Sequence, residues 1–210
     1  MTKTDKENTE EKILDAAKKV FVTKGSDGAR MQEIADEAGI NKSLLHYYYR
    51  SKEKLFAAVF KFAFKKFAPN LMGIFENESD IFTKITSFIH SYIDIINKNP
   101  FIPLFIINEV SKKNAGFVGA VIKNSGMNID LFEKEIKKEI KKGTIKQVDH
   151  RQLIVNILAL CVFPFIGRPI IQKVVFEDNE NQYDDFLKSR KEEVSNLIIN
   201  SITLTEGSDK

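Results

Sequence analysis

MQEIADEAGINKSLLHYYYRSKEKLF, residues 31–56, is the stretch of sequence that decides the fold. Its apolar side chains recur three and four residues apart on both sides of a glycine, which predicts two short amphipathic helices. Gly39 stands where a helix ends in a left-handed residue, and Asn41 is a good N-cap for the next helix. Two short helices joined by a turn that contains glycine are typical of a helix-turn-helix. The residues expected to face inward are Met31, Ile34, Ala35, Ala38, Leu45 and Tyr48.

The sequence on either side of this motif continues the helical pattern. Before it, apolar residues at helical spacing predict a first helix that ends at Gly25. After it, Ser51 is expected to cap a longer helix that Pro69 ends. We therefore expect a disordered polar arm over residues 1–8, a helix-turn-helix domain over residues 9–50 and a connecting helix over residues 51–69.

The rest of the chain is expected to form a larger C-terminal helical domain over residues 70–204, followed by a tail over 205–210. Prolines, glycines and a polar run divide it into segments. The predicted helices cover residues 79–98, 101–113, 115–123, 129–142, 149–163 with a continuation to about 175, and 180–202. The expected fold class is all-α, with roughly nine or more helices.

Composition supports the same fold class. The 210 residues are 43% hydrophobic and include only ten glycines, five prolines and no tryptophan, while helix-forming residues dominate. The polar N-terminus predicts no secretory signal, and the longest apolar stretch, residues 153–167, is shorter than the roughly 20 residues of a membrane-spanning helix. We expect a cytoplasmic protein that does not enter a membrane.

Cysteine and histidine usage argues against a metal site or a cofactor. Cys161 is the single cysteine, so no intrachain disulfide forms, and its apolar surroundings favour a small buried side chain. The three histidines, His46, His90 and His150, have no partner at metal-ligand spacing. We expect neither a metal nor a cofactor.

The charge distribution is more informative than the net charge of +3. Between residues 42 and 66, seven basic residues stand against Glu53 alone, and a local positive field of this kind is typical of phosphate binding. The basic residues are Lys42, Arg50, Lys52, Lys54, Lys61, Lys65 and Lys66. The three at positions 61–66 are expected to form a solvated helix face instead.

The second helix of the motif suits recognition of a DNA groove. Its inner face holds Leu45 and Tyr48, with Tyr49 at its end, so the other side chains face outward. Such a helix must present polar side chains that reach base edges and phosphates. The outward residues are Lys42, Ser43, Leu44, His46 and Tyr47. Lys42 suits a guanine edge or a phosphate, Ser43 suits a base or a phosphate, and Leu44 suits a thymine methyl.

These residues resemble the TetR family of bacterial one-component repressors. The matching features are the pair Ile34-Ala35, the turn Gly39-Ile40, the aromatic helix at residues 45–49 and Ser-Lys-Glu-x-Leu at residues 51–55. The resemblance covers residues 9–67. It implies that the chain binds double-stranded operator DNA, that Tyr47 contacts a phosphate and that Lys52 binds another.

The sequence departs from the family pattern at two positions. Arg30 stands where a Thr or Ser usually caps the second helix and touches phosphate, so a phosphate contact is expected there through charge alone. His46 stands where a Tyr is common, so base readout is expected to differ. Gln32, on the outer face of the same helix, is a further candidate for a base or phosphate contact.

The resemblance also implies a homodimer and an effector. The helices at about 149–163 and 180–202 pair through apolar stripes, and two such pairs would form a four-helix bundle. The effector would be a small apolar or amphipathic molecule among the helices of the C-terminal domain. Weak candidates for its site, each equally explained by core packing or by a solvated position, are Phe105, Asn108, Asn156, Cys161 and Arg168.

Three classes of function are compatible with the sequence. The favoured one is a ligand-responsive dimeric regulator of transcription, most simply a repressor. A helical enzyme or carrier would need a catalytic constellation, and the sequence has no motif for one. An architectural DNA-binding protein without an effector would lack an apolar pocket, which separates it from the first class.

Overall fold

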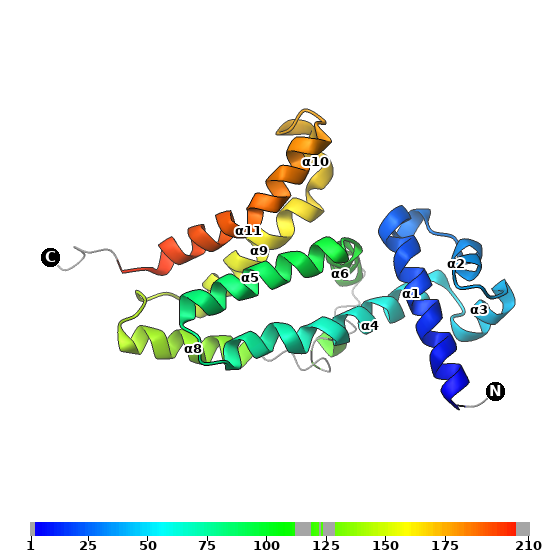
Figure 1. Cartoon of the computed structure of the whole chain (residues 1–210), viewed down its shortest axis with the longest axis horizontal. Coiled ribbons are helices and arrows are strands. Elements are labelled where there is room, and N and C mark those ends of the chain that lie inside the picture. Colours follow the sequence, from blue (N-terminus) through cyan, green and yellow to red (C-terminus); the bar gives the residue numbers. More distant parts are fainter. Residues whose placement is uncertain (1–2, 112–118, 122, 124–128, 205–210) are drawn as a thin grey trace. The chain divides into compact units, whose positions relative to one another are not determined.

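The structure is a computed structural model that describes residues 3–111, 119–121, 123 and 129–204. Within these ranges it contains helices and no strand, as the all-α prediction requires (Figure 1). The helices are α1 (Lys3–Gly28), α2 (Met31–Glu37), α3 (Lys42–Tyr48), α4 (Lys52–Gly73), the 3-10 helix η1 (Ile74–Glu76), α5 (Ile81–Lys98), α6 (Phe101–Ser111), α8 (Ile129–Lys142), α9 (His150–Ile166), α10 (Arg168–Val174) and α11 (Glu180–Ile202). Most of the helix expected over residues 115–123 lies outside the described residues.

The helices belong to two compact units. One comprises Met1–Phe67 and Asn99–Ser125, and the other comprises Ala68–Lys98 and Gly126–Lys210. Helix α6 therefore groups with the N-terminal unit, whereas the sequence pattern assigned residues 70–204 to one C-terminal domain. Aromatic packing explains the difference, because the ring of Phe105 lies 4.8 Å from that of Phe56 and 4.9 Å from that of Phe60.

Two helix ends differ from the expected ones. Helix α1 begins at Lys3, ahead of the expected arm boundary at residue 8, and has non-helical backbone at Gly25, with φ of 69°. Helix α4 continues past Pro69 to Gly73. Pro69 is exposed while Ala68 and Leu71 are buried. The carbonyl that the proline leaves without an N–H partner therefore lies on the solvent side of α4. Loss of this helical hydrogen bond destabilises the helix least there, because water can bond the carbonyl.

The N-terminal unit has a small core between α1, α2, α3 and the start of α4. Phe21 of α1 packs against Phe56 of α4 with ring centroids 4.4 Å apart. Ile34 and Leu45 are fully buried, so each short helix of the motif contributes one face to this core. These positions are the inward ones that helical periodicity predicts.

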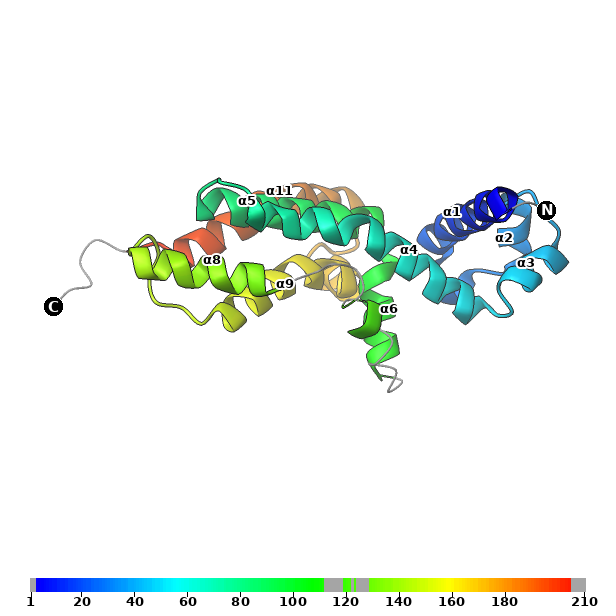
Figure 2. The same cartoon turned by 90° about the horizontal axis from the view of Figure 1, so that it is seen from below.

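The second unit is a bundle in which α5 packs against α9 and α11, and α8 packs against α5 and α9 (Figures 1 and 2). Its core is almost wholly aliphatic and aromatic. Fully buried members include Ile85, Ile89, Phe132, Ile136, Ile157, Cys161, Val194 and Ile202.

Helix α9 ends in a sharp bend, and two side chains of α11 donate hydrogen bonds to backbone carbonyls near it. Pro164 has no N–H to give to the carbonyl of Leu160, and the guanidinium of Arg190 donates to that carbonyl instead. The buried hydroxyl of Tyr183 donates to the carbonyl of Pro164 at 2.7 Å. Two backbone acceptors near the bend are thereby satisfied from α11.

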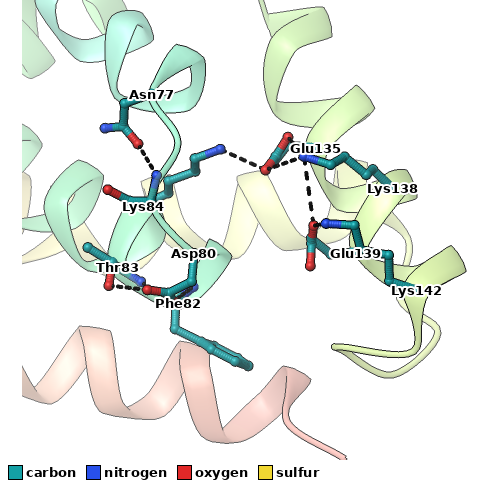
Figure 3. A network of polar contacts seen from close by, with 10 residues as sticks. Asn77, Asp80, Phe82, Thr83, Lys84, Glu135, Lys138, Glu139 and Lys142 are labelled. Carbon is teal, nitrogen blue, oxygen red and sulfur yellow. Dashed lines mark hydrogen bonds and ion pairs between the residues drawn. The ribbon is translucent and has the colours of Figure 1, made fainter.

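A chain of alternating charges joins α5 to α8 (Figure 3). Lys84, only 3% exposed, donates to Glu135 at 2.7 Å, and Lys138 lies 3.3 Å from the other oxygen of Glu135. Lys142 continues the chain at 2.7 Å from Glu139. Asp80 caps the start of α5 by accepting from the backbone N–H and the hydroxyl of Thr83. The buried charges are therefore paired, as burial requires.

Across the described ranges, no single helix is long and apolar enough to cross a membrane. Helices α9 and α10 reach that length and apolarity only as a pair, and they are bent by 72°.

Candidate nucleic-acid interface

The turn of the helix-turn-helix is closed by two backbone hydrogen bonds. The N–H of Gly39 donates to the carbonyl of Asp36 at 3.1 Å, and the N–H of Ile40 donates to that of Ala35 at 3.0 Å. This Schellman pattern requires a left-handed residue, and Gly39 has a φ of 66°. The turn is thus dictated by local sequence, and the prediction of positive φ at this glycine is confirmed.

Helix α3 starts and packs as its sequence predicts. The side chain of Asn41 accepts from the backbone N–H of Leu44 at 2.7 Å, which makes it the N-cap. Leu45 and Tyr49 are buried and Tyr48 is half-buried, so this side of α3 faces the core.

The opposite side of α3 presents the predicted DNA contacts to solvent. Lys42, Ser43, His46 and Tyr47 are exposed, with Tyr47 at 72%, while Leu44 is half-buried. A tyrosine this exposed contributes little to the core. The structure thus places these side chains on one face of one helix, and their contacts with bases and phosphates remain predictions.

The two candidates on α2 are exposed and take part in local hydrogen bonds. Arg30 is the N-cap residue, and its backbone N–H donates to the carboxylate of Glu33 at 3.3 Å. This bond is the half of a capping box that Glu33 supplies. The half that a Thr or Ser would supply is missing, because a guanidinium has no acceptor, and the guanidinium lies in solvent. Gln32 donates from Nε2 to Asp36 at 2.8 Å.

Lys52, the first residue of α4, is half-buried, and its amine donates to the backbone carbonyl of Asp27 at 3.3 Å. The charge is therefore held beside the end of α1. Nothing in the sequence pattern indicated this anchoring, because the two residues are 25 positions apart.

Ion pairs hold α1 against α2. Lys19 lies 2.9 Å from Glu37, and Lys24 lies 3.0 Å from Glu33. The hydrogen bond from Lys24 lowers the pKa of Glu33, so this carboxylate stays charged at neutral pH. The pairs neutralise acidic residues near the motif, although exposed pairs of this kind stabilise a fold only weakly.

The candidate effector residues are divided between the two units. Phe105 belongs to the N-terminal unit, whereas Asn156, Cys161 and Arg168 belong to the other. Asn156 is exposed, and Arg168 lies over the ring of Tyr183 at 5.0 Å. The side chain of Asn108 lies outside the described part of the chain.

Cys161 is fully buried, and burial raises the pKa of its thiol to about 12. The thiol is therefore neutral and unreactive at physiological pH. Among the described residues, no group of three or more His, Cys, Asp and Glu side chains is arranged to hold a metal ion.

Two open pockets lie in the second unit, and neither includes a candidate effector residue. One, of about 370 Å³, lies between α8 and the start of α9 and is lined by Ile136, Ile140 and His150, among others. The other, of about 540 Å³, contains the charge chain of Figure 3.

Helices α9 and α11 carry an apolar face that their own unit leaves exposed. The stripes that predicted their pairing, including Ile157 and Val194, are buried within the unit. On the other side, Val155 is 58% exposed, Phe163 61% and Leu197 55%. Exposed apolar side chains of this size are a common feature of protein interfaces.

The comparisons with known proteins agree on the N-terminal unit. Residues 13–59 match the model for bacterial regulatory proteins of the tetR family. The repressor NicS of Pseudomonas putida is 39% identical over 61 residues, which are 29% of each chain. The repressor SCO4008 of Streptomyces coelicolor is 44% identical over 59 residues, 28% of this chain and 31% of the relative. The matched part is thus under a third of these curated relatives.

Solved structures share the architecture along the whole chain. A TetR/AcrR-family regulator from Thermobifida fusca aligns with a TM-score of 0.67 at 14% identity, covering 97% of this chain and 100% of that chain. The regulator FadR of Bacillus subtilis, in complex with stearoyl-CoA, aligns with a TM-score of 0.64 at 16% identity, covering 88% and 97%. Identities this low show the fold alone, and the sequence match lies in the helix-turn-helix. The helix-turn-helix region of this chain therefore matches the tetR family of bacterial regulatory proteins.

Proposed function

We propose that this protein is a homodimeric repressor of transcription that binds a palindromic operator and releases it on binding a small effector. The observation that carries the proposal is the exposed face of α3, where Lys42, Ser43, His46 and Tyr47 lie together on a capped and well-packed helix. A helix with a buried inner face and polar outer side chains is what the major groove accommodates.

Each side chain has a role that follows from its chemistry. Lys42 and Ser43 lie in the first turn of α3, the part of a recognition helix that reaches base edges. Leu44 suits a thymine methyl, and His46 a base edge. Tyr47 would contact a phosphate through its hydroxyl.

The flanking residues would set the position of α3 in the groove. Lys52 would bind a phosphate at the start of α4, where backbone N–H groups also favour an anion. Both Arg30 and Gln32 are exposed at the start of α2. Arg30 would contact a phosphate beside the same groove, and Gln32 a base or a phosphate.

The exposed face of α9 and α11 supports the homodimer. A second copy that covers Val155, Phe163 and Leu197 would remove their apolar surface from water. A two-fold axis through this face would make the assembly symmetric, and a dimer of this kind binds half-sites about 34–36 Å apart.

The effector is proposed to be apolar or amphipathic. The fold is shared with FadR of Bacillus subtilis, which was solved with stearoyl-CoA, and this suggests long-chain acyl compounds as the first to test. An effector changes operator affinity only by binding the two states of the protein with different affinity.

The first experiment is selection of duplexes from a random pool by the full-length protein, followed by fluorescence anisotropy at several salt concentrations. DNA upstream of the protein's own gene is tested in parallel. We expect a palindromic site bound far more tightly than the unselected pool, with an affinity that falls steeply with salt. Binding without sequence preference contradicts the proposal.

The second experiment separates a regulator from an architectural protein. Palmitoyl-CoA and stearoyl-CoA are added to the complex with the selected duplex, with free coenzyme A as the control. Release of DNA by an acyl compound, together with a higher unfolding temperature of the free protein, supports an effector site. If a broad panel of apolar compounds gives neither, the effector part of the proposal is wrong while DNA binding stands.

A further inference from the structure

The end of the recognition helix is tied to the first helix of the chain. Tyr49 follows α3 as its C-cap residue, with extended backbone at φ −133° and ψ 102°. Its side chain is only 8% exposed, and its hydroxyl donates to Oε1 of Glu10 at 2.8 Å. The bond therefore joins α1 to the point where the chain leaves α3, across 39 positions of sequence.

This hydrogen bond is of the stronger kind. Its acceptor is a carboxylate and it lies in a partly buried position, and both conditions strengthen a hydrogen bond. Burial, and then the hydrogen bond and charge of Glu10, raise the pKa of Tyr49 above its ordinary range. The phenol is thus protonated, and able to donate, throughout the physiological pH range.

The other contacts in the unit hold different parts of the motif. The ion pairs of Lys19 and Lys24 join α1 to α2, and Leu45 packs α3 into the core near its middle. The cap of Asn41 and the turn at Gly39 hold the start of α3. The bond to Glu10 acts at the opposite end of α3, so it restrains the direction in which that helix points.

We propose that Glu10 and Tyr49 are a positioning pair, which holds α3 at the angle from which its outer face reads DNA. The inference rests on the proposed function, because a recognition helix needs a fixed angle only if it enters a groove. Neither residue is assigned a contact with DNA. A helix that rocks about its buried middle spends less time in the binding orientation, which lowers affinity by the fraction lost.

The competing explanation is that the aromatic ring of Tyr49 simply fills the core and its hydroxyl has no role. Tyr49→Phe separates the two, because it keeps the ring and removes the donor. Glu10→Ala removes the acceptor, whereas Glu10→Gln keeps an acceptor and removes the charge. Glu11→Ala is the matched control, since Glu11 is the exposed neighbour with the same charge.

The experiment measures the affinity of full-length variants for the selected duplex. We expect Tyr49→Phe and Glu10→Ala each to weaken binding roughly three- to tenfold per protomer, because α3 would then spend only about a third to a tenth of the time in the binding orientation. The double variant should bind no more weakly than either single one, because both remove the same interaction. Glu10→Gln should recover most of the affinity, and Glu11→Ala should bind as the wild type does.

Two further readouts distinguish positioning from other roles. The slope of log affinity against log salt should not change, because no phosphate contact is lost. Hydrogen exchange should quicken in α3 and stay the same in α9 and α11. Wild-type affinity for Tyr49→Phe, a changed salt slope, or an equal loss in Glu11→Ala overturns the inference. If the wild type selects no duplex at all, the proposed function has failed instead.

Discussion

The guanidinium of Arg190 donates to the backbone carbonyl of Leu160 from both Nε, at 3.3 Å, and Nη2, at 3.1 Å. In an unbroken helix this carbonyl would accept from the N–H of residue 164, but that residue is a proline. A side chain of α11 thus replaces a backbone bond of α9. The backbone of α9 near its bend therefore depends on α11 for a hydrogen-bond donor.

Replacing Arg190 by Met should destabilise the fold by about 1–3 kcal/mol, because the carbonyl of Leu160 is left without its partner. Met keeps the aliphatic packing of the side chain near Phe186. The free energy of unfolding is measured by urea titration. Lys188→Met is the control, since its pair with Asp185 is exposed and should change stability by less than about 0.5 kcal/mol.

Replacing Gly39 by Ala should cost about 1–2 kcal/mol, because an L-residue is strained at a φ of 66°. No atom lies within 4 Å of the added Cβ, so the cost is conformational and not steric. Gly39→Asn should be milder, since asparagine tolerates this region. Thermal unfolding monitored by circular dichroism checks both. An equal loss for the two variants would show that the cost is not one of backbone conformation.

Replacing Lys42 by Met should weaken operator binding, because the proposed contact with a phosphate or a guanine is lost. The salt dependence of the affinity distinguishes a phosphate contact from a guanine contact. Loss of a phosphate contact lowers the slope of log affinity against log salt by about 0.9 per protomer. Loss of a guanine contact instead relaxes sequence preference at one position, by about 1–3 kcal/mol. Anisotropy titrations with the selected duplex and its single-base variants measure both. Lys61→Met, on the exposed face of α4, should change neither.

Replacing Lys84 by Met should destabilise the protein by about 2–4 kcal/mol, since the half-buried carboxylate of Glu135 then lacks its main partner. The double variant Lys84→Met/Glu135→Leu should recover most of this loss, because an apolar pair has no charge to desolvate. Urea unfolding at pH 7 tests both variants. A double variant as unstable as the single one would show that Lys84 acts through packing alone.

The same pair predicts a loss of stability in acid. Burial raises the pKa of Glu135, but the hydrogen bonds and charges of Lys84 and then Lys138 outweigh it, so the pKa is lowered overall. A lowered folded-state pKa gives stability that is present above the unfolded value of about 4.3 and is lost as the pH falls through the folded value. Urea unfolding between pH 7 and pH 3 should show a smaller decrease in Glu135→Leu.

Replacing Leu197 by Glu should convert the proposed dimer into monomers, because symmetry places a charge from each copy in an apolar interface. Analytical ultracentrifugation measures the mass, and operator affinity should fall with it. Ile129→Glu is the control, since Ile129 of α8 is 53% exposed against 55% for Leu197. An unchanged mass for Leu197→Glu would place the interface elsewhere.

The helix-turn-helix could be predicted from the sequence because its determinants lie within a few residues of one another. The left-handed glycine, the asparagine cap and the buried Leu45 all act on the adjacent turn of helix. Hydrogen bonds between near neighbours and helical periodicity are set by local chemistry, so the sequence alone determined the motif and which face of α3 is exposed.

Only the tertiary structure decided which distant side chains meet. The bonds from Tyr49 to Glu10 and from Lys84 to Glu135 span 39 and 51 residues, and helical periodicity says only that such side chains share a face. Helix α6 joins the N-terminal unit because the ring of Phe105 fits between Phe56 and Phe60. Partner choice of this kind depends on the shapes of faces packed against each other, and close packing determines it after the helices have formed.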